Sequence, residues 1–273
     1  MSPALEIADL HAWHGESHVL RGVNLQVAPG EIVVLLGREG SGRTATLHAT
    51  LGLMHTRTGS VRIGGTESIT LSSHKIARLG VGYCAGEHEV FAGLSCEENL
   101  LLPMSADDGT LGGGMPLAEI YDLFPSLLAQ RHAPGAGLPR GDRRMLAVAR
   151  LLRTGANLLL LDDILEGLTP TATQAFMRMS PALKTKGYTM LMVERSVRHA
   201  TPLGDRYYVM TDGRISDQFN ASDLRNKHAA LETLLDARVL PPHNDRRGRA
   251  DSCHGGTLTD RGDTSTCHQP LQQ

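Results

Sequence analysis

Residues 37 to 44, Gly-Arg-Glu-Gly-Ser-Gly-Arg-Thr, have the spacing of a phosphate-binding loop. In the pattern G-x-x-x-x-G-K-[ST], backbone N–H groups surround a phosphate, and the final hydroxyl ligates Mg²⁺. Glycines at positions of this kind permit unusual φ angles and close backbone approach. The chain has arginine where the pattern has lysine. We assign phosphate binding to Gly37, Gly40, Ser41, Gly42, Arg43 and Thr44, and Mg²⁺ binding to Thr44 as well.

The flanking sequence predicts the elements that must hold this loop. Residues 32 to 36, Ile-Val-Val-Leu-Leu, form a short apolar run rich in β-branched residues, which is typical of a buried parallel strand. Residues 44 to 51 contain no glycine or proline and can form a helix. Strand, glycine-rich turn and helix together direct backbone N–H groups at an anion. The alternative is an ordinary glycine-rich turn, and the flanking elements favour the phosphate loop.

A second apolar strand ends in two acidic residues. Residues 157 to 163 read Asn-Leu-Leu-Leu-Leu-Asp-Asp. Ligands of open α/β sheets bind beyond the carboxyl ends of the strands. Asp162 is therefore a candidate to hold Mg²⁺ opposite Thr44, and Asp163 is a candidate to polarise an attacking water. The alternative is a buried strand that meets solvent at its acidic end.

Composition limits the classes of protein to consider. The 273 residues are 41% hydrophobic, which is enough for a sizeable core. A formal charge of −2 and a pI near 6.7 give no reason to expect a nucleic-acid partner. The sequence has no apolar run of about 20 residues. Residues 1–10 have no basic region or long apolar core, so we do not expect a signal peptide. Four scattered cysteines are typical of a reduced, cytoplasmic chain.

The chain divides into an ordered body and a polar tail. We expect one domain over residues 1–240, a flexible glycine-rich loop at 106–115, and a disordered tail over 241–273, which has almost no large apolar residues. The tail carries Cys253-His254 and Cys267-His268. A zinc site there is the alternative to a solvated tail, but paired adjacent ligands are a weak signal.

Several further segments recur in the order and spacing of a known family. They are residues 20–25, 77–83, 97–102, 121–125, 145–150, 158–170, 192–194 and 205–214, together with the phosphate loop. Through them, residues 5 to 240 resemble the ATP-binding subunit of an ABC transporter. Within that superfamily the chain resembles the shorter ATP-binding subunit of branched-chain amino-acid importers.

The resemblance implies a fold and a set of partners. The fold is α/β: a P-loop NTPase core with a parallel sheet flanked by helices, an N-terminal antiparallel β portion, and a helical subdomain near residues 95–152. It implies ATP and Mg²⁺ as ligands and a head-to-tail dimer with a second ATP-binding subunit. It also implies transmembrane permease subunits, and indirectly a periplasmic or extracellular binding protein. The location implied is cytoplasmic and peripheral, on the inner face of the cell membrane.

The chain departs from this family at its phosphate contacts. Arg43 keeps the charge of the loop lysine but is a wider, planar fork. The signature segment, normally Leu-Ser-Gly-Gly followed by Glu or Gln, aligns with residues 138–142, Leu-Pro-Arg-Gly-Asp. Pro139 has no hydroxyl and no N–H, and the Arg140 side chain would crowd a close backbone approach. The helix after it keeps Met145, Val148, Ala149 and Leu152 on one face.

The remaining catalytic positions are also altered. The family's catalytic glutamate aligns with Asp163, which is shorter by one C–C bond, and misplacement of about 1 Å can lower a rate about 100-fold. Gly86 stands at the Q-loop and Arg195 at the switch position. His14 stands at the adenine-stacking aromatic, and the neighbouring Trp13 could replace it or could pack on the first strand.

Three functions follow from these observations. The first is an ATP-binding subunit of an amino-acid importer with weakened hydrolysis. The second is a catalytically inactive ABC-like scaffold or regulatory subunit. The third is a soluble P-loop kinase or GTPase, but the chain lacks an N-K-x-D guanine motif and an arginine-rich lid. We favour the first.

Overall fold

The computed structural model describes residues 2–85, 90–102, 114–200 and 203–236, with the side chains of 199, 200 and 236 left out. One compact unit covers residues 1–237. The expectations for Gly86, for most of the loop at 106–115, and for the tail with Cys253, His254, Cys267 and His268 lie outside the described residues.

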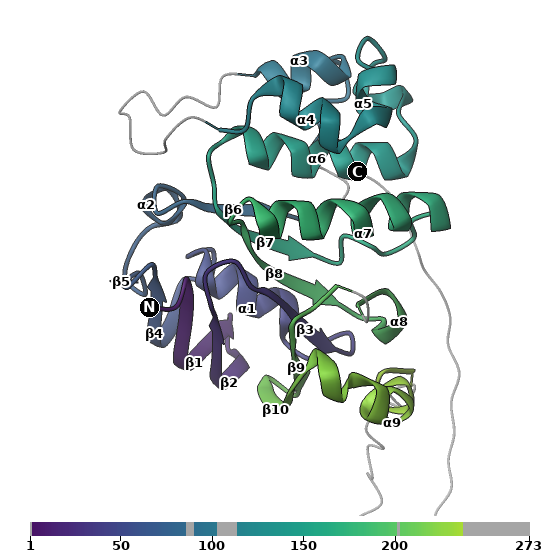
Figure 1. Cartoon of the computed structure of the whole chain (residues 1–273). Helices are drawn as coiled ribbons and strands as arrows, with labels where there is room; N and C mark the ends of the chain where they lie inside the picture. The colour runs from purple at the N-terminus through teal and green to yellow at the C-terminus, as the bar shows by residue number, and fades with distance from the viewer. Residues whose placement is uncertain (1, 86–89, 103–113, 201–202, 237–273) are drawn as a thin grey trace, which may run out of the picture. The chain divides into compact units, whose positions relative to one another are not determined.

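A six-stranded sheet forms the centre of this unit (Figure 1). Its order is β10-β9-β3-β8-β7-β6, and all neighbours are parallel except β10 and β9. The strands are β3 (Ile32–Gly37), β6 (Val81–Cys84), β7 (Leu158–Asp162), β8 (Thr189–Glu194), β9 (Arg206–Thr211) and β10 (Arg214–Asn220). Every residue of β3, β7 and β8 is buried, as expected of a parallel sheet covered on both faces. The expected parallel core is confirmed.

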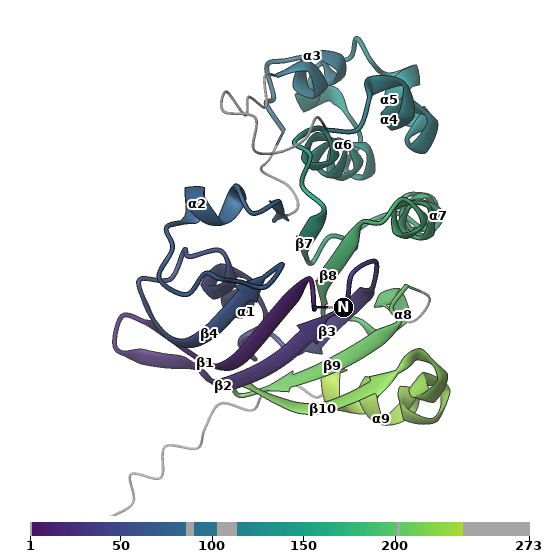
Figure 2. The same cartoon turned by 60° about the vertical axis from the view of Figure 1, so that its left-hand side comes forward.

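A second, antiparallel sheet is built from the N-terminal part of the chain (Figure 2). Its order is β2-β1-β4-β5, with β1 (Leu5–His14), β2 (Ser17–Val27), β4 (Thr56–Ile63) and β5 (Thr66–Glu67). The pairing of β1 with β2 changes register between Ile7 and Leu10, and Asp9 has φ of 48° there. The expected antiparallel portion is therefore present.

The two faces of the central sheet belong to different hydrophobic cores. Successive side chains of a strand point to opposite faces. On β3, Val34 and Leu36 join one core with the helices that follow residue 96, while Val33 and Leu35 join the other with Leu47 and the antiparallel sheet. The phosphate loop thus begins at the end of a strand that is held from both sides.

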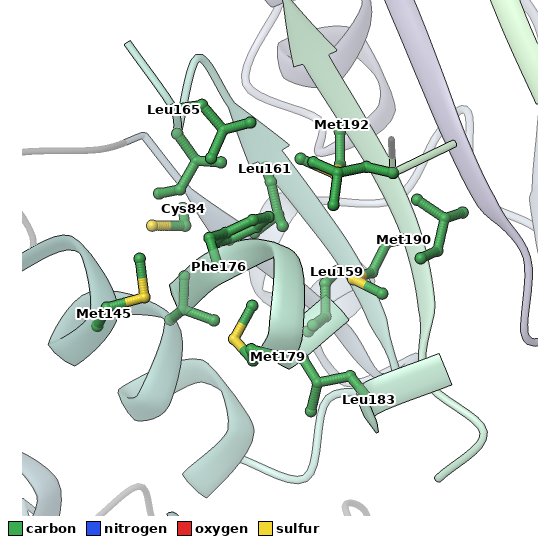
Figure 3. Packing of buried hydrophobic residues seen from close by; sticks show 14 of the residues in the cluster. Cys84, Met145, Leu159, Leu161, Leu165, Phe176, Met179, Leu183, Met190 and Met192 are labelled. Carbon is green, nitrogen blue, oxygen red and sulfur yellow. The ribbon is translucent and has the colours of Figure 1, made fainter. Parts of the chain in front are cut away.

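The helices lie mainly on one side of the sheet. The short α3 (Cys96–Leu101), α4 (Leu117–Leu123) and α5 (Pro125–Ala129) pack around α6 (Arg140–Arg153), and α6 contacts α7 (Pro170–Thr185). Figure 3 shows Phe176, Met179 and Leu183 of α7 packed against Leu159 and Met190 of the sheet. The other elements are α1 (Arg43–Thr50), α2 (Ser73–Ala77), α8 (Val197–Ala200), α9 (Leu224–Asp236) and the 3₁₀ turns Gly135–Gly137 and Ala221–Asp223.

None of the helices in the described ranges is long and apolar enough to cross a bilayer. The four helices α3 to α6 fall in the stretch where the resemblance implies a helical subdomain.

Candidate nucleotide-binding site

The phosphate loop connects β3 to α1 through two glycines in the left-handed region. Gly40 has φ of 76° and Gly42, the N-cap of α1, has φ of 105°, angles that other residues adopt only with strain. The Ser41 N–H donates a hydrogen bond to the Arg38 carbonyl oxygen at 3.1 Å, which closes the turn. The loop lines a cavity of about 390 Å³ together with Asp163 and Arg195. Apart from Gly37, which ends β3, the predicted loop residues therefore line one cavity with both candidate catalytic residues.

Two donors in the loop have no acceptor among the described residues. They are the buried hydroxyl of Ser41 and Nε of Arg43. The Ser41 hydroxyl faces Gly37, where an added Cβ would lie only 2.4 Å from it. Buried donors are normally satisfied, so a phosphate oxygen would suit this loop. The residues present fit an anionic ligand.

Arg43 does not extend freely toward the cavity. Its side chain is only 5% exposed, and Nη1 donates to Oδ1 of Asp163 at 3.2 Å. Burial lowers the pKa of Arg43, and the neighbouring Asp163 opposes that shift. The cation at the lysine position is thus paired with the acid that aligns with the catalytic glutamate.

Thr44 and Asp162 bring two oxygen atoms together at the expected metal position. Thr44 Oγ1 donates to Asp162 Oδ1 at 3.2 Å, and Tyr83 donates to Oδ2 at 3.3 Å. Burial raises the pKa of Asp162, while these two hydrogen bonds oppose the shift. In the described part of the chain no group of three or more His, Cys, Asp or Glu could hold a metal. Mg²⁺ is commonly held by one or two carboxylates plus substrate phosphates, so this arrangement fits it.

Asp163 has a left-handed backbone conformation, and two arginines lie near its carboxylate. Its φ is 45°, which Asp tolerates better than most residues. Besides Arg43, Nε of Arg195 lies 4.0 Å from Asp163 Oδ2. Arg195 also pairs with Glu166 and, at 3.6 Å, with Glu39. Two cations therefore hold the carboxylate that is the candidate base.

Two buried ionisable residues near Asp163 were not assigned a role from the sequence. Glu194 ends β8 and is 1% exposed, and burial, with Asp163 nearby, raises its pKa to about 8. Arg144 of α6 is also buried and donates to the carbonyl oxygens of Asp163 and Ile164 at 3.0 and 2.6 Å. The sequence could have indicated Glu194, because it is an acidic residue at the end of an apolar run, residues 190–194.

Trp13 and His14 line a second cavity rather than the first. It has a volume of about 460 Å³ and also includes His48 and His55. Val19 and Ala45 line both cavities, so the two adjoin. The Trp13 ring stacks on His18 with centroids 4.4 Å apart and planes 8° apart, while His14 is exposed.

The altered signature segment starts α6 without a side-chain cap. Pro139 is the N-cap residue and accepts no hydrogen bond through its side chain. The guanidinium of Arg140 lies over Gly167, within 2.9 Å of the position a Cβ would take there. Met145, Val148, Ala149 and Leu152 are all buried, as predicted.

Comparison with known proteins decides the family. A profile described as "ABC transporter" matches residues 20–166, more than half of the chain. The chain belongs to the ABC transporter family. It is an ATP-binding subunit of an ABC transporter.

Relatives of this ABC subunit serve different transporters. It is 31% identical to the high-affinity branched-chain amino acid transport ATP-binding protein BraG of Pseudomonas aeruginosa, covering 77% of this chain and 90% of that one. It is 30% identical to the lipopolysaccharide export system ATP-binding protein LptB of Acidithiobacillus ferridurans, covering 79% and 89%. A nucleotide-free ATP-binding cassette from an ABC transporter has a TM-score of 0.73, with 19% identity, over 84% of this chain and 96% of that chain. This likeness confirms the fold.

Proposed function

We propose that this ABC subunit binds Mg-ATP and hydrolyses it slowly. Binding is supported by the left-handed glycines, by the donors of Ser41 and Arg43 that have no acceptor, and by the proximity of Thr44 to Asp162. Phosphates would lie on residues 37–44, Mg²⁺ between Thr44 and Asp162, and adenine beside Trp13 or His14.

The Arg43–Asp163 pair carries the case for weak hydrolysis. One oxygen of this carboxylate already accepts from Arg43 and the other lies 4.0 Å from Arg195, so neither is free to orient an attacking water. Arg195, at the switch position, would hold Asp163 rather than a phosphate. Arg43 can offer Nε to a phosphate while its Nη1 stays on Asp163. A phosphate and Asp163 would therefore compete for the remaining donors of Arg43.

The transported substrate is proposed from the sequence resemblance. The segments in the order of branched-chain amino-acid importers, and the similarity to BraG, support import of branched-chain or related amino acids. The subunit would act on the inner face of the membrane with permease subunits and a second ATP-binding subunit. A binding protein outside the membrane would deliver the amino acid.

A catalytically inactive scaffold is the second candidate. It is favoured by the same Arg43–Asp163 pair together with Pro139 and Arg140, which replace the serine and first glycine of the signature. In this function the pair would remain closed and the fold would serve to bind a partner.

An equilibrium titration with Mg-ATP tests the proposal. We expect binding in the micromolar range, with dimerisation on addition of nucleotide and turnover well below that of an ordinary importer subunit. Arg43→Lys should bind several-fold more tightly, because lysine is a compact point charge that cannot form the same fork. Asp163→Asn is the control, since it should abolish residual turnover but retain binding.

Two results would contradict the proposal. Absence of binding up to millimolar ATP would favour the scaffold. Steady-state turnover equal to that of an ordinary importer subunit would show that the Arg43–Asp163 pair does not limit hydrolysis.

A further inference from the structure

A series of hydrogen bonds reaches Asp162 at the oxygen that Thr44 does not contact. Asp162 is 8% exposed, and each of its oxygens accepts one hydroxyl, Thr44 on Oδ1 and Tyr83 on Oδ2. Tyr83 lies on β6, next to β7, where it pairs in register with Leu160. The two hydroxyls together fix the rotation of the carboxylate plane.

Tyr83 is itself held by the phosphate-loop helix. The Tyr83 hydroxyl lies 3.1 Å from Nε2 of His48, and the two rings meet edge to face at 5.8 Å. His48 follows Thr44 by four residues, so both project from the same side of α1. Helix α1 therefore reaches Asp162 twice, once directly through Thr44 and once through His48 and Tyr83.

The number of protons on each group decides which one donates in each of these hydrogen bonds. A tyrosine hydroxyl has one proton, and here it is directed to Asp162. With the tyrosine proton on Asp162, we assign the donor role in the contact between Tyr83 and His48 to Nε2 of His48. The order of donation is His48 to Tyr83 to Asp162.

We propose that Tyr83 and His48 are positioning residues that hold the Asp162 carboxylate in the orientation needed for Mg²⁺. This rests on the proposed binding of Mg-ATP. Partners of metal-ligating carboxylates orient those ligands, and their loss typically lowers metal affinity 10- to 100-fold. His48 also lines the cavity that contains Trp13, so it lies beside the site proposed for adenine.

The test measures how much Mg²⁺ strengthens ATP binding. The metal enhancement is the ratio of the ATP dissociation constant in EDTA to that in excess Mg²⁺, each measured by calorimetry on the full chain. Tyr83→Phe should lower the enhancement about 10-fold and leave the EDTA value unchanged, because it removes only the hydroxyl. His48→Leu should lower the enhancement by the same factor, with the ratio taken against its own EDTA value because His48 also lines the cavity that contains Trp13. The double variant should lose no more of the enhancement than either single variant, because both residues act through one series of hydrogen bonds.

Two variants separate positioning from a general structural effect. His48→Gln places an amide donor near the Nε2 position and should retain most of the enhancement. Tyr121→Phe is the matched control, because Tyr121 is also half-buried and donates to a carboxylate, that of Glu97 at 3.4 Å, away from this site. It should leave the enhancement unchanged.

The outcomes distinguish the two proposals. If wild type shows a metal enhancement and Tyr83→Phe stays within two-fold of it, the positioning role is wrong and the proposed function stands. If His48→Gln loses as much as His48→Leu, His48 does not act as the donor. If wild type binds no ATP in either condition, both proposals fail.

Discussion

At the scale of single residues, the site is governed by how buried charges are compensated. Arg43 and Arg144 are buried cations, and Asp163 and Glu194 are the acids near both. A buried charge is tolerated only with a partner or with a shifted pKa. Arg43 takes the first course by pairing with Asp163, and Glu194 takes the second by remaining protonated to higher pH. An arginine in place of the loop lysine therefore changes how the charges of all four of these residues are compensated.

Glu194→Gln should change the pH dependence of stability. The folded pKa of about 8 lies above the ordinary glutamate value of 4.5, so between these values the folded state keeps a proton that the unfolded chain releases. Stability from this group is complete below the unfolded pKa and is lost as pH rises through about 8. Wild type should lose about 2 kcal/mol between pH 6 and 8, whereas Glu194→Gln should lose little. Urea unfolding at both pH values measures the difference.

The control for this experiment is Glu232→Gln. The pKa of Glu232 is lowered by its contact with Arg198, so this carboxyl is ionised in both states above pH 6. The variant should keep the wild-type pH dependence. A wild-type stability that does not change between pH 6 and 8 would mean that Glu194 is charged in the folded state.

At the scale of elements, the helices begin in different ways. Ser95 caps α3 with a complete capping box: its hydroxyl accepts from Glu98 N at 3.1 Å, and Glu98 accepts from Ser95 N at 2.7 Å. Ser72 precedes α2 without a side-chain cap, and α6 begins at Pro139. The position of α6 therefore depends on its buried face and on Arg144 rather than on its cap.

Ser95→Ala should destabilise the protein by about 1 kcal/mol, because two donors at the start of α3 lose their reciprocal partners. Ser72→Ala is the matched control and should change stability by less than about 0.5 kcal/mol. Denaturant midpoints of the two variants provide the comparison. Equal losses would show that the capping box adds nothing beyond the helix itself.

At the scale of the whole compact unit, the turn between β9 and β10 joins three parts of the fold. Gly213 has φ of 77°, its N–H donates to Ser41 O at 2.8 Å, and its carbonyl accepts from Arg21 N at 2.9 Å. The turn thereby links the phosphate loop, the antiparallel sheet and the central sheet. A Cβ at this position would lie 2.2 Å from Val19 O.

Gly213→Ala should lower the free energy of unfolding by more than about 2 kcal/mol, because it combines a left-handed φ with a backbone clash. Gly30→Ala is the matched control: φ is 72° there, but nothing lies within 4 Å of the added Cβ. It should cost only about 1 kcal/mol. We would measure both by thermal and urea unfolding. Similar losses would show that the turn can shift away from Val19.

Local pattern alone determined the elements that carry the site. The apolar runs at 32–36 and 158–161 predicted covered strands, which the structure confirms. The glycine spacing at 37–44 favoured a strand-turn-helix loop, because these preferences arise within a few neighbouring residues. Order along the chain also indicated the family, which the comparisons confirmed. The predicted roles of the site residues remain predictions.

Tertiary structure alone decided which charges meet. The sequence contains Arg43 in the loop and Asp163 after a later strand, 120 residues apart. Nothing in their local sequence indicated that the two side chains pair at 3.2 Å. Likewise Tyr83 reaches Asp162 because β6 lies beside β7, and Glu194 is buried because β8 lies between β3 and β7. Burial and pairing depend on strand order and on which helix face packs inward, and neither is encoded in the spacing of nearby residues.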